Sequence, residues 1–155
     1  MTKVPCLGTG IGLILVFHCF VRVSQKLEYA CRAMVQLSQH YDGQTLTRLD
    51  DLAQREVVSA NFLVQILNDL KRGDLVLSKR GKNGGYLLAR DPREISLLDI
   101  IRVVEPSMLN PNTSDVGESG PVIQRAWDQI HQSLLKELSS VTLDSLGTHS
   151  PMFYI

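Results

Sequence analysis

The chain has 155 residues, enough for one domain of ordinary size with a hydrophobic core and an additional arm or tail. Hydrophobic residues make up 44% of it and charged residues 21%, a globular composition that excludes a disordered or fibrous protein. The formal net charge is zero, yet segment 71–93 contains seven basic and two acidic residues, whereas segment 94–155 contains three and eight. Such a local excess of positive charge is typical of surfaces that bind nucleic-acid phosphates.

The cysteines and histidines argue against a disulfide-stabilised, metal-binding or catalytic protein. Cys6, Cys19 and Cys31 are too few and too far apart for a disulfide framework, and no two of them have metal-ligand spacing. A reducing compartment, and therefore a cytoplasmic location, fits them best. The histidines are scattered, and the chain has neither a GxxxxGK[ST] motif nor a strand–GxGxxG–helix unit. We therefore predict a protein that is not an enzyme and has no metal or other cofactor.

Residues 1–22 form an atypical apolar extension. Val4–Val21 is an uncharged run of 18 residues, long enough in principle for a signal peptide or a membrane span. Glycines and a proline interrupt its first half, and no small-residue cleavage site precedes Ser24. Three possibilities stay open: a start assigned upstream of a true start at Val21, a membrane-associating arm, or a secretion signal. We favour the first, so a membrane is not an expected partner.

Three helices with apolar faces are predicted next. Ser24 can cap the first, which extends to His40 with apolar side chains at three- and four-residue steps. Thr47 can cap the second, which ends near Arg55, and Ser59 can cap the third. Two short helices with a tight connection are the layout of a helix-turn-helix.

After the third helix the hydrophobic period changes from 3.6 to about 2 residues. This predicts two short strands, residues 75–77 and 86–88, around a basic, glycine-rich turn. A β-hairpin directly behind a helix-turn-helix is a wing. Ser96 can cap a fourth helix, which Pro106 ends. The expected fold is mostly α with a small β-hairpin, a winged helix-turn-helix over residues 23–105.

The pattern of residues 106–155 predicts a connector followed by a dimerisation helix. Residues 106–120 are rich in turn-forming residues and are expected to be a flexible connector, followed by a long helix and its end at 121–147 and an uninformative tail at 148–155. The helix has an apolar seam close to coiled-coil spacing, made of Ile123, Trp127, Ile130, Leu134, Leu138 and Val141. Because the domain before it should be complete without it, we expect a second copy of the chain to cover this seam.

Polar side chains on the third helix and the wing are candidate DNA contacts. Asn and Gln can bind adenine in the major groove through two hydrogen bonds, and an Arg on a hairpin can enter a narrow minor groove or bind phosphates. The wing glycines would let backbone amides approach a phosphate closely. From the helix we select Ser59, Asn61 and Gln65, and from the wing Lys79, Arg80, Lys82, Asn83 and Tyr86. Ser24 and Lys26 of the first helix are added to them.

Several strings resemble one family of proteins. They are VSQKLEYACRAM, SANFLVQILNDLKRGDLV, SKRGKNGGYLLARDP, ISLLDIIRVVE and SVTLDSLG, which span about Val21 to Gly147. They resemble the bacterial winged-helix transcription regulators of the Rrf-two type, which include IscR, NsrR and CymR. The resemblance implies a dimer with a long crossing helix near the C-terminus. It also implies DNA contacts from Ser59, Asn61, Phe62, Gln65 and Arg80.

The chain departs from the family at its sensor. Many members hold an iron–sulfur cluster on three cysteines between the fourth helix and the dimerisation helix, but Glu105–Pro121 contains no cysteine. Glu28 stands where some relatives supply a carboxylate ligand, and one carboxylate cannot hold such a cluster. The resemblance therefore implies a cluster-free, CymR-like branch that responds to a small-molecule or protein effector, for which the connector is our candidate site. Val64 replaces an acidic residue that some members use to choose between operator types, so we do not expect that choice here.

These features predict a sequence-specific DNA-binding transcription regulator, in our interpretation a repressor. It would act as a homodimer on a pseudo-palindromic operator in double-stranded DNA. The alternative is a membrane-tethered or protein-interaction module that uses the N-terminal apolar run as an anchor and the long helix as a docking surface. Fractionation separates the two hypotheses, because a tethered protein sediments with membranes.

Overall fold

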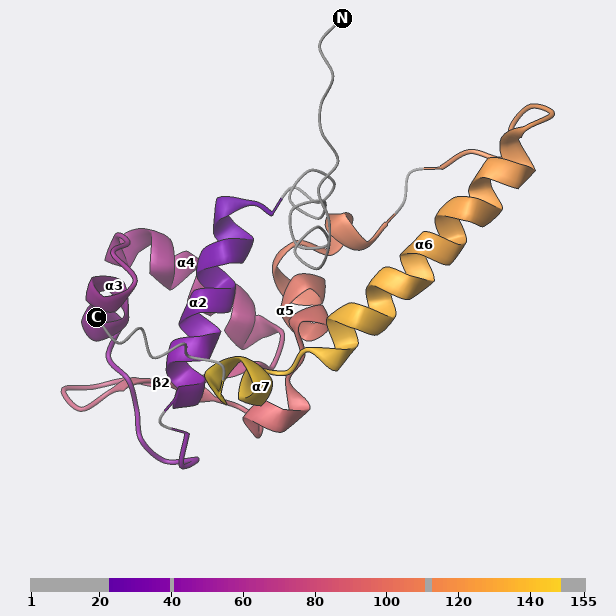
Figure 1. The fold of residues 1–155 in the computed structure, drawn as a ribbon. Coiled ribbons are helices and arrows are strands. Elements are labelled where there is room, and N and C mark those ends of the chain that lie inside the picture. Colours follow the sequence, from indigo (N-terminus) through magenta and orange to yellow (C-terminus); the bar gives the residue numbers. More distant parts are fainter. Residues whose placement is uncertain (1–22, 40, 111–112, 149–155) are drawn as a thin grey trace, which may run out of the picture.

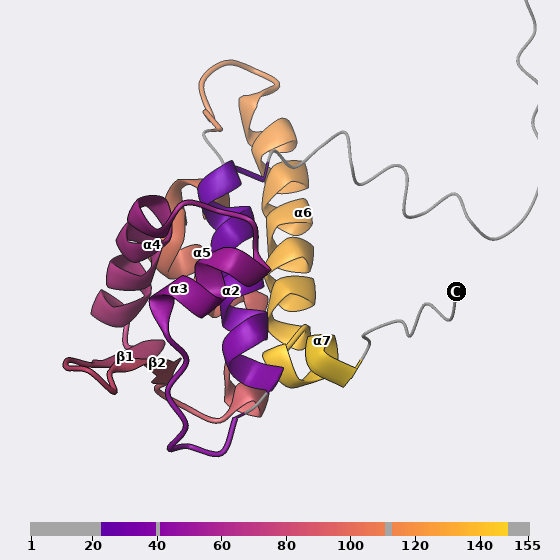
Figure 2. The same cartoon turned by 90° about the vertical axis from the view of Figure 1, so that its left-hand side faces the viewer.

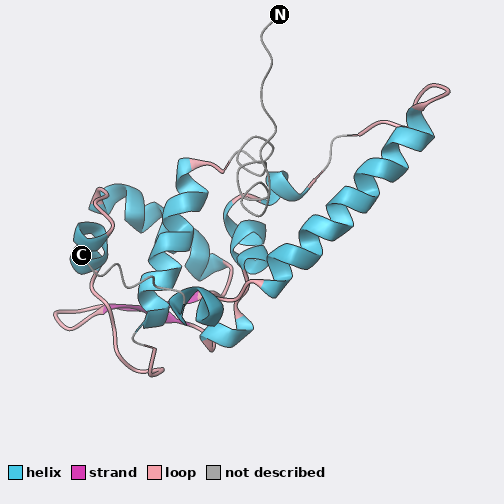
Figure 3. Ribbon diagram, in the orientation of Figure 1, coloured by secondary structure: helices cyan, strands magenta, loops and turns pink. Residues whose placement is uncertain are grey.

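A computed structural model describes residues 23–39, 41–110 and 113–148 (Figure 1). The apolar run and the tail from residue 149 lie outside the described residues, so the predictions made for them stay predictions. The elements are α2 (Gln25–Gln39), α3 (Leu49–Arg55), α4 (Ala60–Arg72), β1 (Val76–Lys79), β2 (Gly85–Leu88), η2 (Pro92–Glu94), α5 (Leu97–Val104), η3 (Pro106–Leu109), α6 (Gly120–Ser140) and α7 (Leu143–Thr148). Helices dominate and the two strands form one antiparallel hairpin, so the predicted fold class is confirmed (Figure 3).

Helices α2 to α5 pack around one apolar core. Leu63, Ile66, Leu67 and Leu70 lie on the inner face of α4 at the spacing that the sequence predicted, and all four are buried. The Ser59 hydroxyl accepts a hydrogen bond from the backbone N–H of Phe62, and Ser96 forms a capping box with Asp99. Ser24 likewise accepts from the N–H of Leu27 at 3.2 Å. These three predicted caps are confirmed.

The predicted cap of α3 is wrong. The residue before α3 is Arg48, whose side chain makes no capping hydrogen bond, and Thr47 lies outside the helix. Thr47 pairs with Tyr86 of β2 instead, and each backbone N–H donates to the other residue's carbonyl at 2.8 Å. Two backbone hydrogen bonds replace the single side-chain bond that a cap would have made, so Thr47 forms an isolated β-bridge to the outer edge of the wing.

The wing has the predicted hairpin form. Strand β1 covers Val76–Lys79 where 75–77 was predicted, and β2 covers Gly85–Leu88 where 86–88 was predicted. Val76 pairs with Leu88 and Lys79 with Gly85. Two of the wing glycines are required by the backbone around them. A Cβ on Gly84 would lie 2.2 Å from the Lys79 carbonyl oxygen, and one on Gly85 would lie 2.6 Å from that of Thr47. Gly84 and Gly85 therefore make room for the chain's own backbone.

The C-terminal elements return to the DNA-binding domain. Leu143 of α7 is fully buried in the core, and its N–H donates to the carbonyl of Ile95 at 2.9 Å. The N–H of Leu97 donates to the carbonyl of Val141 at 2.9 Å. The domain was expected to be complete without the long helix, but Leu138 of that helix packs against the core, and α7 behind it supplies the core side chain Leu143.

The connector also differs from the prediction at its start. Pro106–Leu109 forms the 3-10 helix η3, and Leu109 is buried against the core. Because Pro106 can begin a new helical turn as well as end the preceding helix, the chain continues in ordered form beyond α5. The irregular part of the connector that the structure describes begins after η3.

Candidate nucleic-acid interface

The exposed face of α4 is a continuous polar stripe. Asn61 and Gln65 were predicted to contact DNA, and Asn68 and Arg72 continue the stripe at steps of three and four residues. All four are exposed, whereas the opposite face of α4 is buried. The turn before α4 is tight, since Val57 has φ 53 and the N–H of Val58 donates to the carbonyl of Ala53. The stripe therefore runs the length of a helix that follows a helix-turn-helix connection.

The tip of the wing is basic and accessible. Lys79, Arg80, Lys82 and Asn83 are all exposed. Within the part of the chain that the structure describes, no hydrogen bond or ion pair holds their side chains. The hairpin and α4 lie at one end of the molecule, and the N-terminal half of α6 extends from the other end (Figure 1). Figure 2 shows α4 above the hairpin, on the side away from α6. Helix and wing are thus placed to contact one ligand together.

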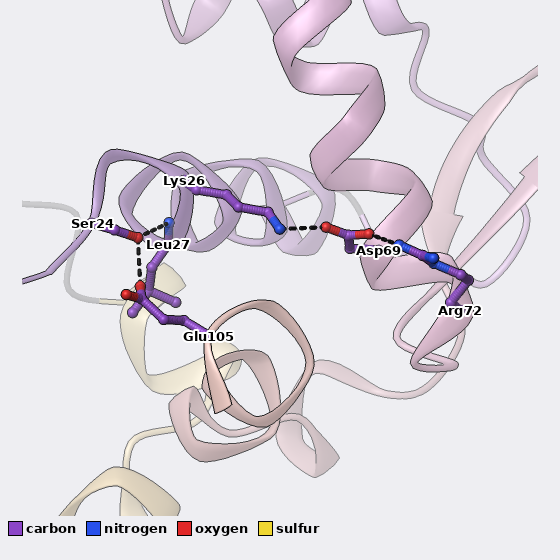
Figure 4. Close-up of polar contacts among 6 residues, drawn as sticks. All are labelled: Ser24, Lys26, Leu27, Asp69, Arg72 and Glu105. Atoms are coloured by element: carbon purple, nitrogen blue, oxygen red, sulfur yellow. Dashed lines mark hydrogen bonds and ion pairs between the residues drawn. The ribbon is translucent and has the colours of Figure 1, made fainter. Parts of the chain in front are cut away.

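Three other predicted DNA-binding residues have partners inside the chain. Phe62 is half-buried and its ring meets that of Tyr29 edge to face, with centroids 6.0 Å apart. Tyr86 is half-buried against the core. The Ser24 hydroxyl donates to the carboxylate of Glu105 at 2.5 Å (Figure 4). These side chains position α2, α4 and the wing, and a direct contact from them to DNA stays a prediction.

A hollow opens beside α4, at the side of the stripe. Its wall consists of Lys26, Gln65, Asn68, Asp69, Lys71 and Arg72. The Lys26 ammonium lies 2.6 Å from the Asp69 carboxylate, which also pairs with Arg72 (Figure 4). The hydrogen bond from Lys26 lowers the pKa of Asp69. Of the wall residues, only Lys26 and Gln65 were predicted to contact DNA, although the helical period from Gln65 would also have found Asn68 and Arg72.

The predicted seam on α6 divides into two parts. Ile123, Trp127 and Ile130 are 54%, 39% and 56% exposed in the single chain. Leu138 instead packs against the core of the same chain, and Val141 lies beyond the last residue of the helix. Leu134, between these parts, is half-buried. The first half of α6 therefore presents an uncovered apolar face, and the second half attaches the helix to its domain.

Comparison with known proteins identifies the family. A family model described as Rrf2, iron-dependent transcriptional regulator, matches residues 23–149. The chain belongs to the Rrf2 family. The HTH-type transcriptional regulator CymR of Bacillus subtilis (strain 168) is 31% identical over 141 residues, which cover 87% of this chain and all of CymR. A Mycobacterium tuberculosis (strain ATCC 25618 / H37Rv) protein named as an HTH-type transcriptional regulator is 38% identical over 128 residues, 79% of either chain.

Solved structures give the same result for the fold. The structure of CymR, described as the global cysteine regulator of B. subtilis, matches with a TM-score of 0.75 at 30% identity and covers 84% of this chain and 99% of its own. T. potens IscR matches with a TM-score of 0.70 at 34% identity, covering 89% and 94%. The chain is thus a DNA-binding transcription regulator of a winged-helix family whose members are regulators and not enzymes.

The donor atoms of the described residues do not fit the iron in the family description. Among them, no group of three or more His, Cys, Asp or Glu side chains could hold a metal ion. Cys31 is the cysteine of this part of the chain, and its burial raises the pKa of the thiol to about 11, with a smaller contribution from Glu28. A high thiol pKa disfavours the thiolate that iron binds. The absence of a cluster stays a prediction.

Absorption spectroscopy tests this prediction. Protein prepared anaerobically with iron and sulfide should be colourless, because the segment between α5 and α6 supplies no thiolate. Visible charge-transfer bands, together with iron near stoichiometric amounts, would contradict it. They would then point to ligands from Cys31, Glu28 or a histidine contributed across a dimer.

The structure also bears on the membrane alternative. None of the helices in the described ranges has the length and apolarity that a membrane span requires. The apolar run itself lies outside those ranges, so fractionation is still the test of that alternative.

Proposed function

We propose that the protein is a homodimeric transcription regulator, in our interpretation a repressor, that binds a pseudo-palindromic operator. Helix α4 would enter the major groove with Asn61 and Gln65 toward the bases, and the wing would bring Arg80 to the flanking minor groove or backbone. The observation that carries this proposal is the joint placement of the polar stripe and the accessible basic wing at one end of the molecule.

The homodimer is supported by the uncovered half of α6. A single copy presents one α4 and one wing, whereas a pseudo-palindromic operator offers two half-sites about one helical turn of DNA apart. An apolar face of large side chains, such as that of Trp127 and Ile130, is typical of a surface that a partner covers. A second copy brings the same face, as a two-fold symmetric contact requires.

An effector is proposed to act through the connector. Control by a small molecule or a protein partner is proposed because Glu105–Pro121 contains no cysteine that could bind a cluster. The connector joins the DNA-binding core, where Leu109 is anchored, to the start of α6. Ordering of this segment would change the distance between the two copies of α4 in the dimer.

Replacement of Arg80 by alanine is the direct test of the DNA proposal. The Arg80→Ala variant should lose roughly 1–3 kcal/mol of operator affinity if the guanidinium enters a groove. If it contacts a phosphate, the slope of log affinity against log salt concentration should fall by about one. Operator fragments selected from random duplex DNA, titrated at several salt concentrations, give both quantities.

A matched control is Arg125→Ala, which removes the same charge from an exposed position of α6. Its affinity and salt slope should equal those of the unmodified chain. If Arg80→Ala also leaves both quantities unchanged, Arg80 is outside the interface.

A further inference from the structure

We propose that the hollow beside α4 is a binding site for a DNA backbone phosphate, and that the Asp69 carboxylate occupies the phosphate's place in the free protein. This inference rests on the proposed function, because it assumes that α4 enters the major groove. It adds a role for Asp69, an acidic residue on a basic surface, as a competitor of DNA within the chain.

The first observation is the convergence of cations on one carboxylate. Lys26 reaches Asp69 from α2, and Arg72 reaches it from the next turn of α4. The Asp69 side chain is 16% exposed, whereas those of Lys26 and Arg72 are 42% and 79% exposed. The carboxylate thus lies deeper than the cations that bind it, and both cations have surface that faces solvent. Lys71, on the same wall, donates to the Ser78 hydroxyl at 2.7 Å.

The second observation is the composition of the hollow. Its wall holds three cations and two amide side chains, and Asp69 is the acidic member. Ammonium and guanidinium groups that bind a carboxylate oxygen also bind a phosphate oxygen, since both acceptors are anionic oxygens with similar hydrogen-bond geometry. A phosphodiester could therefore be bound by the groups that Asp69 now engages.

The third observation is the position of the hollow relative to the predicted recognition surface. Gln65 belongs both to the exposed stripe of α4 and to the wall of the hollow. An α-helix with its side chains is about 10–12 Å wide and the major groove about 12 Å. Side chains that flank the stripe of a helix in the groove therefore meet the backbone. Lys26 flanks the stripe from α2, and Arg72 lies at the C-terminal end of the stripe beside the hollow.

The consequence is a sequence-independent reduction of DNA affinity. A phosphate that approaches Lys26 and Arg72 has to displace an ion pair and tolerate the Asp69 charge. The hydrogen bond from Lys26 lowers the pKa of Asp69, so the carboxylate is ionised at neutral pH and the competition operates there. Because the cations are already neutralised inside the protein, fewer counterions leave the DNA when the complex forms.

The Asp69→Asn variant of the full chain tests this competition. It keeps the shape of the side chain and removes its charge. Binding to a selected operator duplex and to a duplex of mixed sequence should both increase by a similar factor. One additional phosphate contact steepens the salt slope by about 0.9, which corresponds to roughly eightfold in affinity at 0.1 M salt. The control Asp51→Asn removes a charge from an exposed position in the first turn of α3 and should leave the slope unchanged.

A second variant covers the case in which Asp69→Asn fails to fold, which thermal denaturation would reveal. Lys26→Gln should weaken binding to both duplexes and lower the salt slope by about one. If the folded variants leave the slope unchanged, or if Asp51→Asn changes it as much as Asp69→Asn does, the proposal is overturned. Weaker binding by Asp69→Asn would also overturn it, because Asp69 would then hold the cations in place for DNA.

Binding by the unmodified chain separates failure of the phosphate proposal from failure of the proposed function. A titration with inorganic phosphate separates a DNA phosphate from a free anion as the ligand. An unmodified chain that binds neither duplex would refute the proposed function itself, whereas normal binding with unchanged slopes refutes only the phosphate site. Inorganic phosphate, titrated at constant ionic strength, tests a free anion as the ligand. If it raises the melting temperature of the unmodified chain but not of Lys26→Gln, while the DNA salt slopes stay equal, the site binds a free anion and the proposal is wrong.

Discussion

Replacement of Ile130 by aspartate is expected to separate the proposed dimer into single chains. Ile130 is 56% exposed and shares one face of α6 with Ile123 and Trp127. In a two-fold symmetric contact, each copy would place an aspartate in the apolar interface, without a partner. Burial of an unpaired charge costs several kcal/mol, so the dissociation constant of the dimer should increase by roughly a hundredfold or more.

Sedimentation equilibrium over a range of protein concentrations measures this change. The control is Gln132→Asp, which introduces the same charge at an exposed position about half a helical turn away from the seam. This variant should remain dimeric. Operator affinity, measured at a concentration where the unmodified chain is dimeric, should fall for Ile130→Asp alone, because one copy contacts one half-site. An Ile130→Asp chain that sediments as a dimer would place the interface on another surface.

The local elements were predictable because each depends on residues close together in the chain. The spacing from Leu63 to Leu70 defined α4, and Ser59 and Ser96 supplied caps that act within three residues. Thr47 could not be assigned in this way. Its partner, Tyr86, lies far along the chain, and no local pattern shows which backbone groups an irregular segment will pair with.

The part of the candidate site that lies on α4 was also predictable, because its residues are close together in the chain. Asn68 and Arg72 follow from the helical period of Asn61 and Gln65, so the whole stripe was available from the sequence. The contact of Lys26 with Asp69 depends on how α2 crosses α4, which periodicity does not determine. The pKa of Asp69 and the hollow both result from that crossing.

The seam on α6 shows another limit of periodicity. The three- and four-residue steps from Ile123 to Leu138 predicted one partner along the whole helix. Leu138 and its neighbour Leu135 pack against the core of the same chain instead, whereas Ile123 and Ile130 are uncovered. A repeat of apolar positions indicates that one face of the helix is buried. It does not distinguish burial against the same chain from burial against a second copy.

Replacement of Gly85 by alanine is expected to disrupt the attachment of the wing. The new methyl group would lie 2.6 Å from the carbonyl oxygen of Thr47, a backbone atom that cannot rotate away. Relief of this overlap requires separation of Thr47 from Tyr86, which loses two backbone hydrogen bonds of 2.8 Å. Overpacking of this kind and the lost hydrogen bonds together should cost roughly 2–3 kcal/mol of folding free energy.

The measurement is thermal denaturation, in which that loss corresponds to a decrease of about 5–10 °C in a chain of this size. Gly147→Ala is the matched control, because the nearest atom to its new Cβ is the Ser38 hydroxyl oxygen at 3.9 Å and the residue lies in α7. Alanine in a helix should leave the melting temperature equal or slightly higher. Since Arg80 is carried on the displaced hairpin, folded Gly85→Ala protein should also lose operator affinity, by an amount similar to that of Arg80→Ala. An unchanged melting temperature and unchanged affinity would mean that the segment before α3 moves at no cost, and that the pairing of Thr47 with Tyr86 does not hold the wing.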